Sequence, residues 1–163
     1  MITRVKLLAY FIVGGLMAYP IEGYWRLLTP GGNGGWVSIH MLPIYGICLL
    51  GVGILTSYSW FYNRKMWQQS LLGALMVLVV EYVAGMVLNV WLGLAIWCYL
   101  GMPFTDPHGQ VTFIFGFFWF LLMPFAIWME DKITWMYMTA NGIEGATWNY
   151  TLWQAYRDLL TGR

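Results

Sequence analysis

The stretch Leu71–Leu100, LLGALMVLVVEYVAGMVLNVWLGLAIWCYL, decides the fold because it is apolar over almost its whole length. About 20 apolar residues cross a bilayer, so this run predicts a membrane-spanning helix that tilts or bends. Its one acid, Glu81, would cost a few kcal/mol if it faced lipid. We therefore expect Glu81 to face other helices, where it holds a proton, makes hydrogen bonds or binds a cation.

Small and polar residues recur on one face of this helix. If the whole run is helical, one stripe contains Ala74, Glu81, Gly85, Asn89 and Gly93. Small residues let helix backbones approach closely in membranes, and polar side chains hydrogen-bond across the contact. The stripe therefore predicts a face packed inside a bundle, with Gly93 as the place where the helix bends.

The composition is that of a polytopic membrane protein. Of the 163 residues, 60% are hydrophobic and 9% charged, whereas a soluble domain carries roughly 25% charged residues. The mean hydropathy is +0.63. The net charge of +1 argues against a nucleic-acid partner, which calls for a basic patch. Eleven Trp and eleven Tyr suit belts at the two membrane interfaces. Membrane lipids are thus the first expected partner.

The apolar runs predict an all-α fold with four transmembrane helices in residues 1–132. The expected helices span Leu7–Leu28, Ser38–Tyr62, Leu71–Leu100 and Val111–Met129. Two loops rich in glycine and proline, Thr29–Gly35 and Gly101–Gly109, separate the first from the second helix and the third from the fourth. The charged residues Glu130, Asp131 and Lys132 are expected to end the fourth helix.

The aromatic tail, residues 133–163, has no apolar run long enough for a fifth span. Its apolar residues Trp148, Leu152, Tyr156 and Leu159 recur at helical spacing. This pattern predicts an amphipathic helix on the membrane surface. Docking on a partner subunit is the alternative.

The positive charges predict the topology. With four spans, one side of the membrane would hold Arg4, Lys6, Arg64, Lys65, Lys132, Arg157 and Arg163. Only Arg26 would lie near the other side. The positive-inside rule then places both termini in the cytoplasm.

Candidate functional residues lie within the spans. Glu22 and Arg26 are one helical turn apart, in the order that favours an ion pair. They form either a polar binding patch at the outer mouth of the bundle or a self-neutralising pair. Glu81 is either a site residue or a neutral packing acid. Its candidate partners are Tyr45, Asn89 and Gln110.

The outer loops offer further polar residues but no recognised catalytic motif. Asp106, His108 and Gln110 are the outer-loop candidates, and the other histidine, His40, lies near the outer end of the second helix. None of these shows the spacing of helical metal ligands, so we expect no metal site. The sequence carries no phosphate loop, nucleophile elbow or HExxH pair, which disfavours an enzyme. Whether a cofactor binds is unknown from the sequence.

Four segments together resemble the ABC-transporter type IV family of multispan membrane proteins. They are YPIEGYWR (19–26), LPIYGICLLGVGIL (42–55), VVEYVAGMVLNVWLG (79–93) and CYLGMPFTDPHGQVTFIFGFFWFLL (98–122). The resemblance covers roughly residues 5–130. It marks Glu22, Pro43, Tyr45, Gly46, Glu81, Tyr82, Tyr99, Pro103 and Gly109. The chain departs from the family pattern at Trp97–Tyr99, where an acid is missing, and around Thr105, where an asparagine is replaced.

Two functions follow from these patterns. The first is a permease-like or transport-associated protein in which Glu81 and the Glu22/Arg26 pair line a polar path. It would act as an oligomer or with partner subunits, because four helices seldom enclose a pathway for a solute alone. The second is a structural or accessory subunit of a larger membrane complex, whose role is helix packing. A membrane enzyme has the least support.

Overall fold

A computed structural model describes residues 3–28, 35–143 and 148–163, and within these residues the fold is built from helices without a β-strand. An isolated bridge pairs Thr105 with Thr112. The elements in order are α1 (Arg4–Leu28), α2 (Met41–Thr56), α3 (Ser59–Tyr62), α4 (Met66–Gly85), the π-helical η2 (Met86–Trp91), α5 (Phe113–Ala140) and α6 (Leu152–Thr161).

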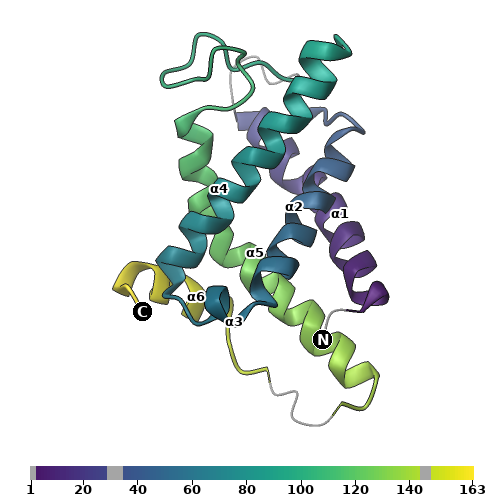
Figure 1. Cartoon of the computed structure of the whole chain (residues 1–163), viewed down its shortest axis with the longest axis vertical. Helices are drawn as coiled ribbons and strands as arrows, with labels where there is room; N and C mark the ends of the chain where they lie inside the picture. The colour runs from purple at the N-terminus through teal and green to yellow at the C-terminus, as the bar shows by residue number, and fades with distance from the viewer. Residues whose placement is uncertain (1–2, 29–34, 144–147) are drawn as a thin grey trace.

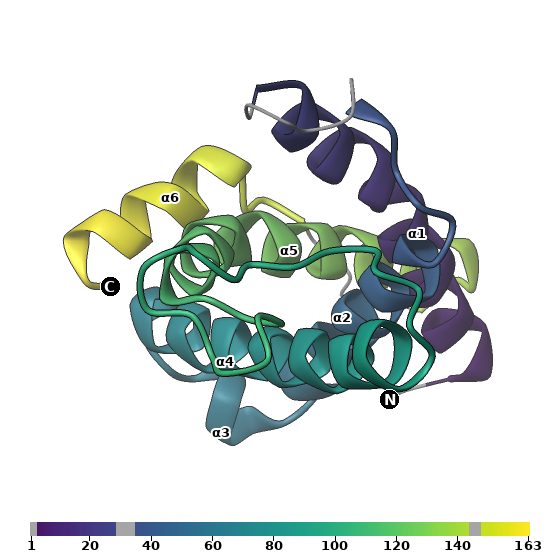
Figure 2. The same ribbon diagram turned by 90° about the horizontal axis from the view of Figure 1, so that it is seen from above.

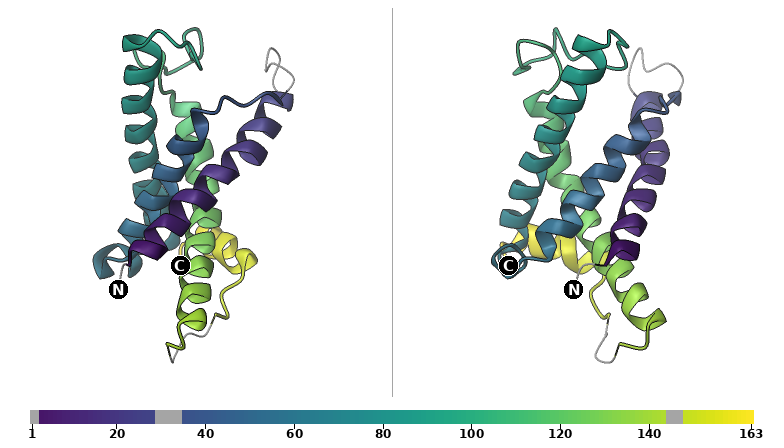
Figure 3. Two further views of the ribbon diagram at one scale, coloured as in Figure 1. Left: turned by 90° about the vertical axis from the view of Figure 1, so that its right-hand side faces the viewer. Right: turned by 45° about the vertical axis from the view of Figure 1, so that its right-hand side comes forward.

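Helices α1, α2, α4 and α5 run lengthwise through the molecule and alternate in direction (Figure 1). The start of α1, the short α3 and the end of α6 lie at one end of the bundle, here called the terminal end. The chain between η2 and α5, residues 92–112, lies across the opposite end, here called the loop end, as the view from above shows (Figure 2). Figure 3 shows α1 crossing the bundle obliquely.

Three helices are long and apolar enough to cross a membrane: Arg4–Leu27, Met66–Trp91 and Phe113–Ala140. The shorter α2 has 16 residues, a length of about 24 Å. The expected helix Ser38–Tyr62 is therefore wrong in length. The helix is interrupted after Thr56, where the hydroxyls of Thr56 and Ser57 donate to backbone carbonyls of the preceding turn. Such side-chain hydrogen bonds compete with the helical backbone bonds, which favours the end of a helix.

Helices α1 and α2 pack closely because a glycine of each helix lies against the backbone of the other. A Cβ atom on Gly14 would lie 2.7 Å from the Tyr45 carbonyl oxygen, and one on Gly46 would lie 2.7 Å from the Phe11 carbonyl oxygen. Gly53 lies against the buried ring of Tyr10. Small residues thus allow close contact between α1 and α2 along most of α2.

Helix α4 has the two faces that its sequence predicts. Ala74, Glu81 and Gly85 are buried, whereas Val79 and Val83 are 63% and 55% exposed. The expected continuation to Leu100 is wrong, because the helix passes into η2 and ends at Trp91. Gly93 follows with φ +66°, a left-handed conformation that glycine adopts without strain.

Helix α5 continues through the charged residues that were expected to end it at Met129. Glu130 is only 4% exposed, and it accepts hydrogen bonds from the hydroxyls of Tyr10 and Thr134. The Lys132 ammonium lies over the rings of Trp128 and Trp148. These charges are held by neighbours within the fold, so they do not need a solvated loop. Position 132 therefore lies inside a continuous helix.

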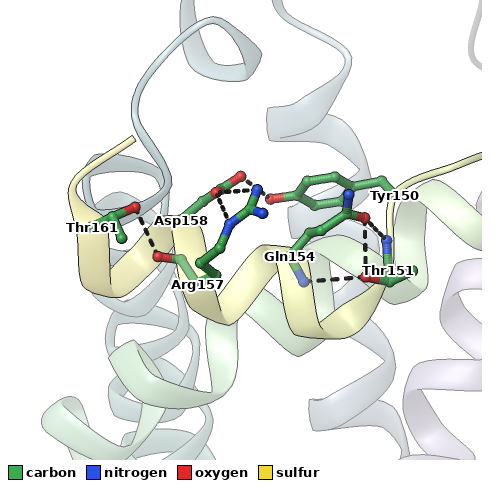
Figure 4. A network of polar contacts seen from close by, with 6 residues as sticks. All are labelled: Tyr150, Thr151, Gln154, Arg157, Asp158 and Thr161. Carbon is green, nitrogen blue, oxygen red and sulfur yellow. Dashed lines mark hydrogen bonds and ion pairs between the residues drawn. The ribbon is translucent and has the colours of Figure 1, made fainter.

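The tail forms the helix α6, which packs on α4 and α5. Thr151 and Gln154 form a capping box at its start, and Asp158 accepts hydrogen bonds from Tyr150 and Arg157 (Figure 4). Trp148 precedes this helix and packs against Trp128 and Trp135, so the expected helical stripe beginning at Trp148 is too long.

Candidate ligand cavity between the helices

A cavity of about 830 Å³ lies between α1, α2, α4, α5 and the 92–112 segment. Four of the predicted site residues line it: Glu22, Arg26, Tyr45 and Glu81. They come from three different helices, α1, α2 and α4. Its volume falls in the range of about 300–1,000 Å³ that is typical of small-molecule sites.

Glu22 forms a neutral polar group on the α1 side of the cavity. The Arg26 Nε donates a hydrogen bond to Glu22 Oε1 at 2.7 Å. The Tyr45 hydroxyl donates to Glu22 Oε2 at 3.3 Å. The predicted one-turn ion pair is therefore present, and it lies on the cavity wall with a tyrosine from α2 as its third member.

Glu81 lies on the α4 side and is 9% exposed. Its Oε1 accepts a hydrogen bond from the Tyr99 hydroxyl at 2.8 Å, and its Oε2 accepts one from Trp119 Nε1 at 3.2 Å. Both donors are neutral. Within the described ranges the ion pairs are Arg26–Glu22 and Arg157–Asp158, so Glu81 has no cationic partner there.

Aromatic rings connect the two carboxylates and form much of the cavity wall. The Tyr45 ring meets the Trp119 ring edge-on, with centroids 5.5 Å apart. The Tyr99 ring stacks on Phe115 at 4.7 Å. Trp25 lies 5.1 Å from Phe115, which joins α1 to α5 at the same wall. A hydrogen-bonded and aromatic network thus runs from Arg26 to Tyr99.

Asn89 and Gln110, two of the candidate partners of Glu81, lie outside the cavity lining and bond to each other as packing polar groups, whereas Glu81 bonds to Tyr99 and Trp119. Asn89 Nδ2 donates to Gln110 Oε1 at 2.8 Å, and Asn89 Oδ1 accepts from the Ile96 N–H at 2.7 Å. The Gln110 side chain packs against Gly85. Because η2 ends at Trp91, the Asn89 side chain bonds the backbone of the 92–112 segment and does not extend the polar face of α4 that contains Glu81.

Asp106 organises the 92–112 segment and does not line the cavity. Its carboxylate accepts hydrogen bonds from the backbone N–H groups of His108, Gln110 and Val111. Desolvation alone would raise the pKa of the Asp106 carboxyl, but these three backbone donors hold it below its usual value. His108 is exposed, and no group of three or more His, Cys, Asp or Glu able to hold a metal occurs in the part of the chain that the structure describes.

Sequence reasoning missed Trp119, because it lies in a run of aromatic residues where no single ring is distinguished. Tyr99 was marked only through the family resemblance. A second buried polar cluster was also missed: Tyr10, Glu130 and Thr134 on α1 and α5. The spacing of Glu130 and Thr134, one turn apart, was its only signal.

The cavity has an apolar floor toward the terminal end. Val52, Val77 and Met123 are each 2% exposed and surround a small apolar hollow below the cavity. This zone separates the carboxylates from the Tyr10–Glu130 cluster. The structure therefore has a largely apolar and aromatic cavity with two carboxylates on its wall, closed on one side by packed apolar side chains.

The fold and the cavity define an all-helical protein with membrane-length helices around an aromatic pocket that carries two carboxylates. No protein-family model, curated protein or solved structure matches this chain.

Proposed function

We propose that this protein is a permease-like, transport-associated membrane protein whose cavity holds a small solute. The observation that carries the proposal is the placement of two carboxylates, the half-buried Glu22 and the buried Glu81, on the wall of one cavity of about 830 Å³. A bundle that served only to pack against neighbours would not need such a space. Polar side chains inside membrane spans commonly mark solute or ion pathways.

Two further features support a transport role. The apolar floor, including Val77 and Met123, would act as a closed barrier between the cavity and the terminal end. Of the nine residues that the resemblance to the ABC-transporter type IV family marks, four line the cavity: Glu22, Tyr45, Glu81 and Tyr99. We take this coincidence as support for membership of that family.

The proposed topology has four crossings, with α2 as the short one and both termini in the cytoplasm. Cationic residues lie at the terminal end. Arg4 and Lys6 are in the first turn of α1. Lys65 and Arg163 lie near each other, because the N–H of Met66, the residue after Lys65, donates to the Arg163 carbonyl at 2.8 Å. By the positive-inside rule that end would face the cytoplasm. The amphipathic α6 would then lie near the inner membrane surface.

A pair of substitutions on α4 tests the transport role. Val77→Phe places a phenyl ring toward the cavity floor, whereas Val79→Phe adds the same volume on the exposed face. The purified proteins would be reconstituted in proteoliposomes and screened for flux with neutral, anionic and cationic small solutes. We expect flux in the native protein and in Val79→Phe, and its loss in Val77→Phe.

Absence of flux for every solute, or equal flux in both folded variants, would contradict the transport role. Because Val77 is buried, Ile96→Trp serves as a second cavity-filling variant on the 92–112 segment.

An accessory subunit is the second candidate. In the most apolar stretches of the three long helices only 22–28% of residues are buried, which leaves wide apolar faces for lipid or for other helices. Size measurement after mild detergent extraction, with identification of co-purifying chains, separates the two candidates. Recovery only in a large hetero-complex would favour the subunit, and a monomer or homo-oligomer would favour the transporter.

A further inference from the structure

We propose that the cavity binds an organic ammonium cation and that the Glu81 carboxylate is its counter-ion. The inference builds on the cavity used in the proposed function and adds the chemical class of its ligand. It follows from the charge on the wall, from the chemistry of that wall and from the way in which each carboxylate is already bonded.

The charge on the wall favours a cation. Glu22 is neutralised by Arg26 at 2.7 Å, so this pair contributes a dipole and no net charge. Glu81 is bonded to two neutral donors, Tyr99 and Trp119. A buried carboxylate without a cationic partner is costly in an apolar environment. A positively charged ligand beside Glu81 would supply the missing partner.

The aromatic lining favours an organic cation. Rings of Trp25, Tyr45, Trp97, Tyr99, Phe115, Phe118 and Trp119 line the same space as Glu81. The faces of such rings attract ammonium groups, and a cage of aromatic rings around the cation is a recognised way to bind quaternary ammonium ions. The ring contacts between Trp119 and Tyr45 and between Tyr99 and Phe115 hold these walls in place.

An inorganic cation fits this wall poorly. Calcium takes six to eight oxygen ligands, and magnesium demands a near-octahedral shell of oxygens. The immediate hydrogen-bond partners of Glu81 are one phenol and one indole N–H, and an indole N–H offers no lone pair to a metal. An anionic ligand would have to compete with Glu22 for Arg26. The organic ammonium ion is the class that uses both the carboxylate and the rings.

The test compares two probes of the same shape, acetylcholine and its neutral isostere 3,3-dimethylbutyl acetate. Binding to the native protein in nanodiscs would be followed by tryptophan fluorescence, since Trp25, Trp97 and Trp119 line the cavity, with empty nanodiscs subtracted. We expect the cation to bind saturably and at least tenfold more tightly than the isostere. This comparison uses the native protein alone and does not depend on the folding of a variant.

Variants then assign the effect to Glu81. Glu81→Gln keeps the shape and removes the charge; its amide oxygen can accept from Trp119 Nε1 and its amide nitrogen can donate to the Tyr99 hydroxyl. It should weaken cation binding about tenfold while leaving the affinity for the isostere unchanged. Glu130→Gln makes the same change at a buried acid outside the cavity, and it should alter neither affinity.

Equal affinity for the two probes would overturn the inference, as would the absence of saturable cation binding to the folded protein. Unchanged cation binding in Glu81→Gln would do so too, because Glu81 would then act as a neutral packing acid. Selective cation binding without flux in proteoliposomes would remove the transport role and support this inference. Flux of a neutral solute together with equal affinity for the two probes would support the transport role and overturn the inference of an ammonium ligand.

Discussion

The contact between Gly53 and Tyr10 gives the sharpest prediction about stability. A methyl group at Gly53, on α2, would overlap the edge of the Tyr10 ring on α1. This ring is fully buried, and its hydroxyl is bonded to Glu130 and lies 2.7 Å from Thr134 Oγ1. Tyr10 therefore cannot retreat without losing hydrogen bonds to α5. Gly53→Ala should force either an overpacked contact or a broken polar cluster.

The structure sets the magnitude of the effect. Overpacking a tight core costs about 1–3 kcal/mol, and loss of a buried hydrogen bond to a charged group costs about 1.5–3 kcal/mol. The matched control is Gly51→Ala, two residues earlier on α2. Its methyl would lie 2.7 Å from the Met76 Sδ, at the far end of a flexible side chain that can move aside. Any gain from replacing glycine by alanine in a helix, about 0.5–1 kcal/mol, applies to both variants.

The assay is equilibrium unfolding of the purified variants in mixed micelles with increasing dodecyl sulfate, followed by tryptophan fluorescence and circular dichroism. We expect the free energy of unfolding of Gly53→Ala to lie about 1–3 kcal/mol below that of Gly51→Ala. Equal stability of the two variants would refute the close packing of Gly53 on a Tyr10 ring held by α5.

Three further predictions follow from other parts of the chain. Because folding lowers the pKa of the Asp106 carboxyl, this carboxylate should stabilise the 92–112 segment fully above the ordinary aspartate pKa near pH ~4, and the stabilisation should be lost as the pH falls below it. Limited proteolysis of this segment should therefore increase at acid pH in the native protein but not in Asp106→Asn. Acid-dependent proteolysis of Asp106→Asn would argue against the mechanism. In intact cells an impermeant thiol reagent should label the exposed Cys98, whereas a cysteine at Asn63 should react only after lysis, and the reverse pattern would invert the proposed topology. Thr151→Ala should remove the capping box and lower the local stability of α6 by about 0.5–2 kcal/mol, seen as faster amide exchange there, and unchanged exchange would exclude a capping role.

Much of the fold could be predicted from the sequence, because the length of an apolar run and its helical periodicity can be read from one continuous stretch of residues. The run around Glu81 predicted a long helix with one buried face, and the structure has Ala74, Glu81 and Gly85 on that face. The ends of helices were less predictable. An apolar run says nothing of where a helix stops, so the turn at Gly93, held by Asn89, was read as a bend within a longer helix.

The site was predictable in its members but not in its pairings. Glu22 and Arg26 could be paired from sequence because they share one helix turn. The partners of Glu81 come from α5 and from the non-helical 92–112 segment, and such contacts depend on how distant parts of the chain pack. Glu130 was misread for a related reason: a charged residue normally marks a helix end in water, and its tertiary partner, Tyr10, lies far away in the sequence.

The existence of a water-accessible cavity inside the bundle is the central claim, and the reactivity of two engineered cysteines on α2 tests it most directly. Ile44 lines the cavity and is 7% exposed, whereas Ile54 is 39% exposed on the outer face of the same helix. In a background where Cys48 and Cys98 are serine, a small water-soluble thiol reagent applied to the protein in bilayers should modify Ile44→Cys rapidly and Ile54→Cys slowly. Equally slow modification of both, or faster modification of Ile54→Cys, would contradict a cavity that holds Glu22 and Glu81 in contact with water.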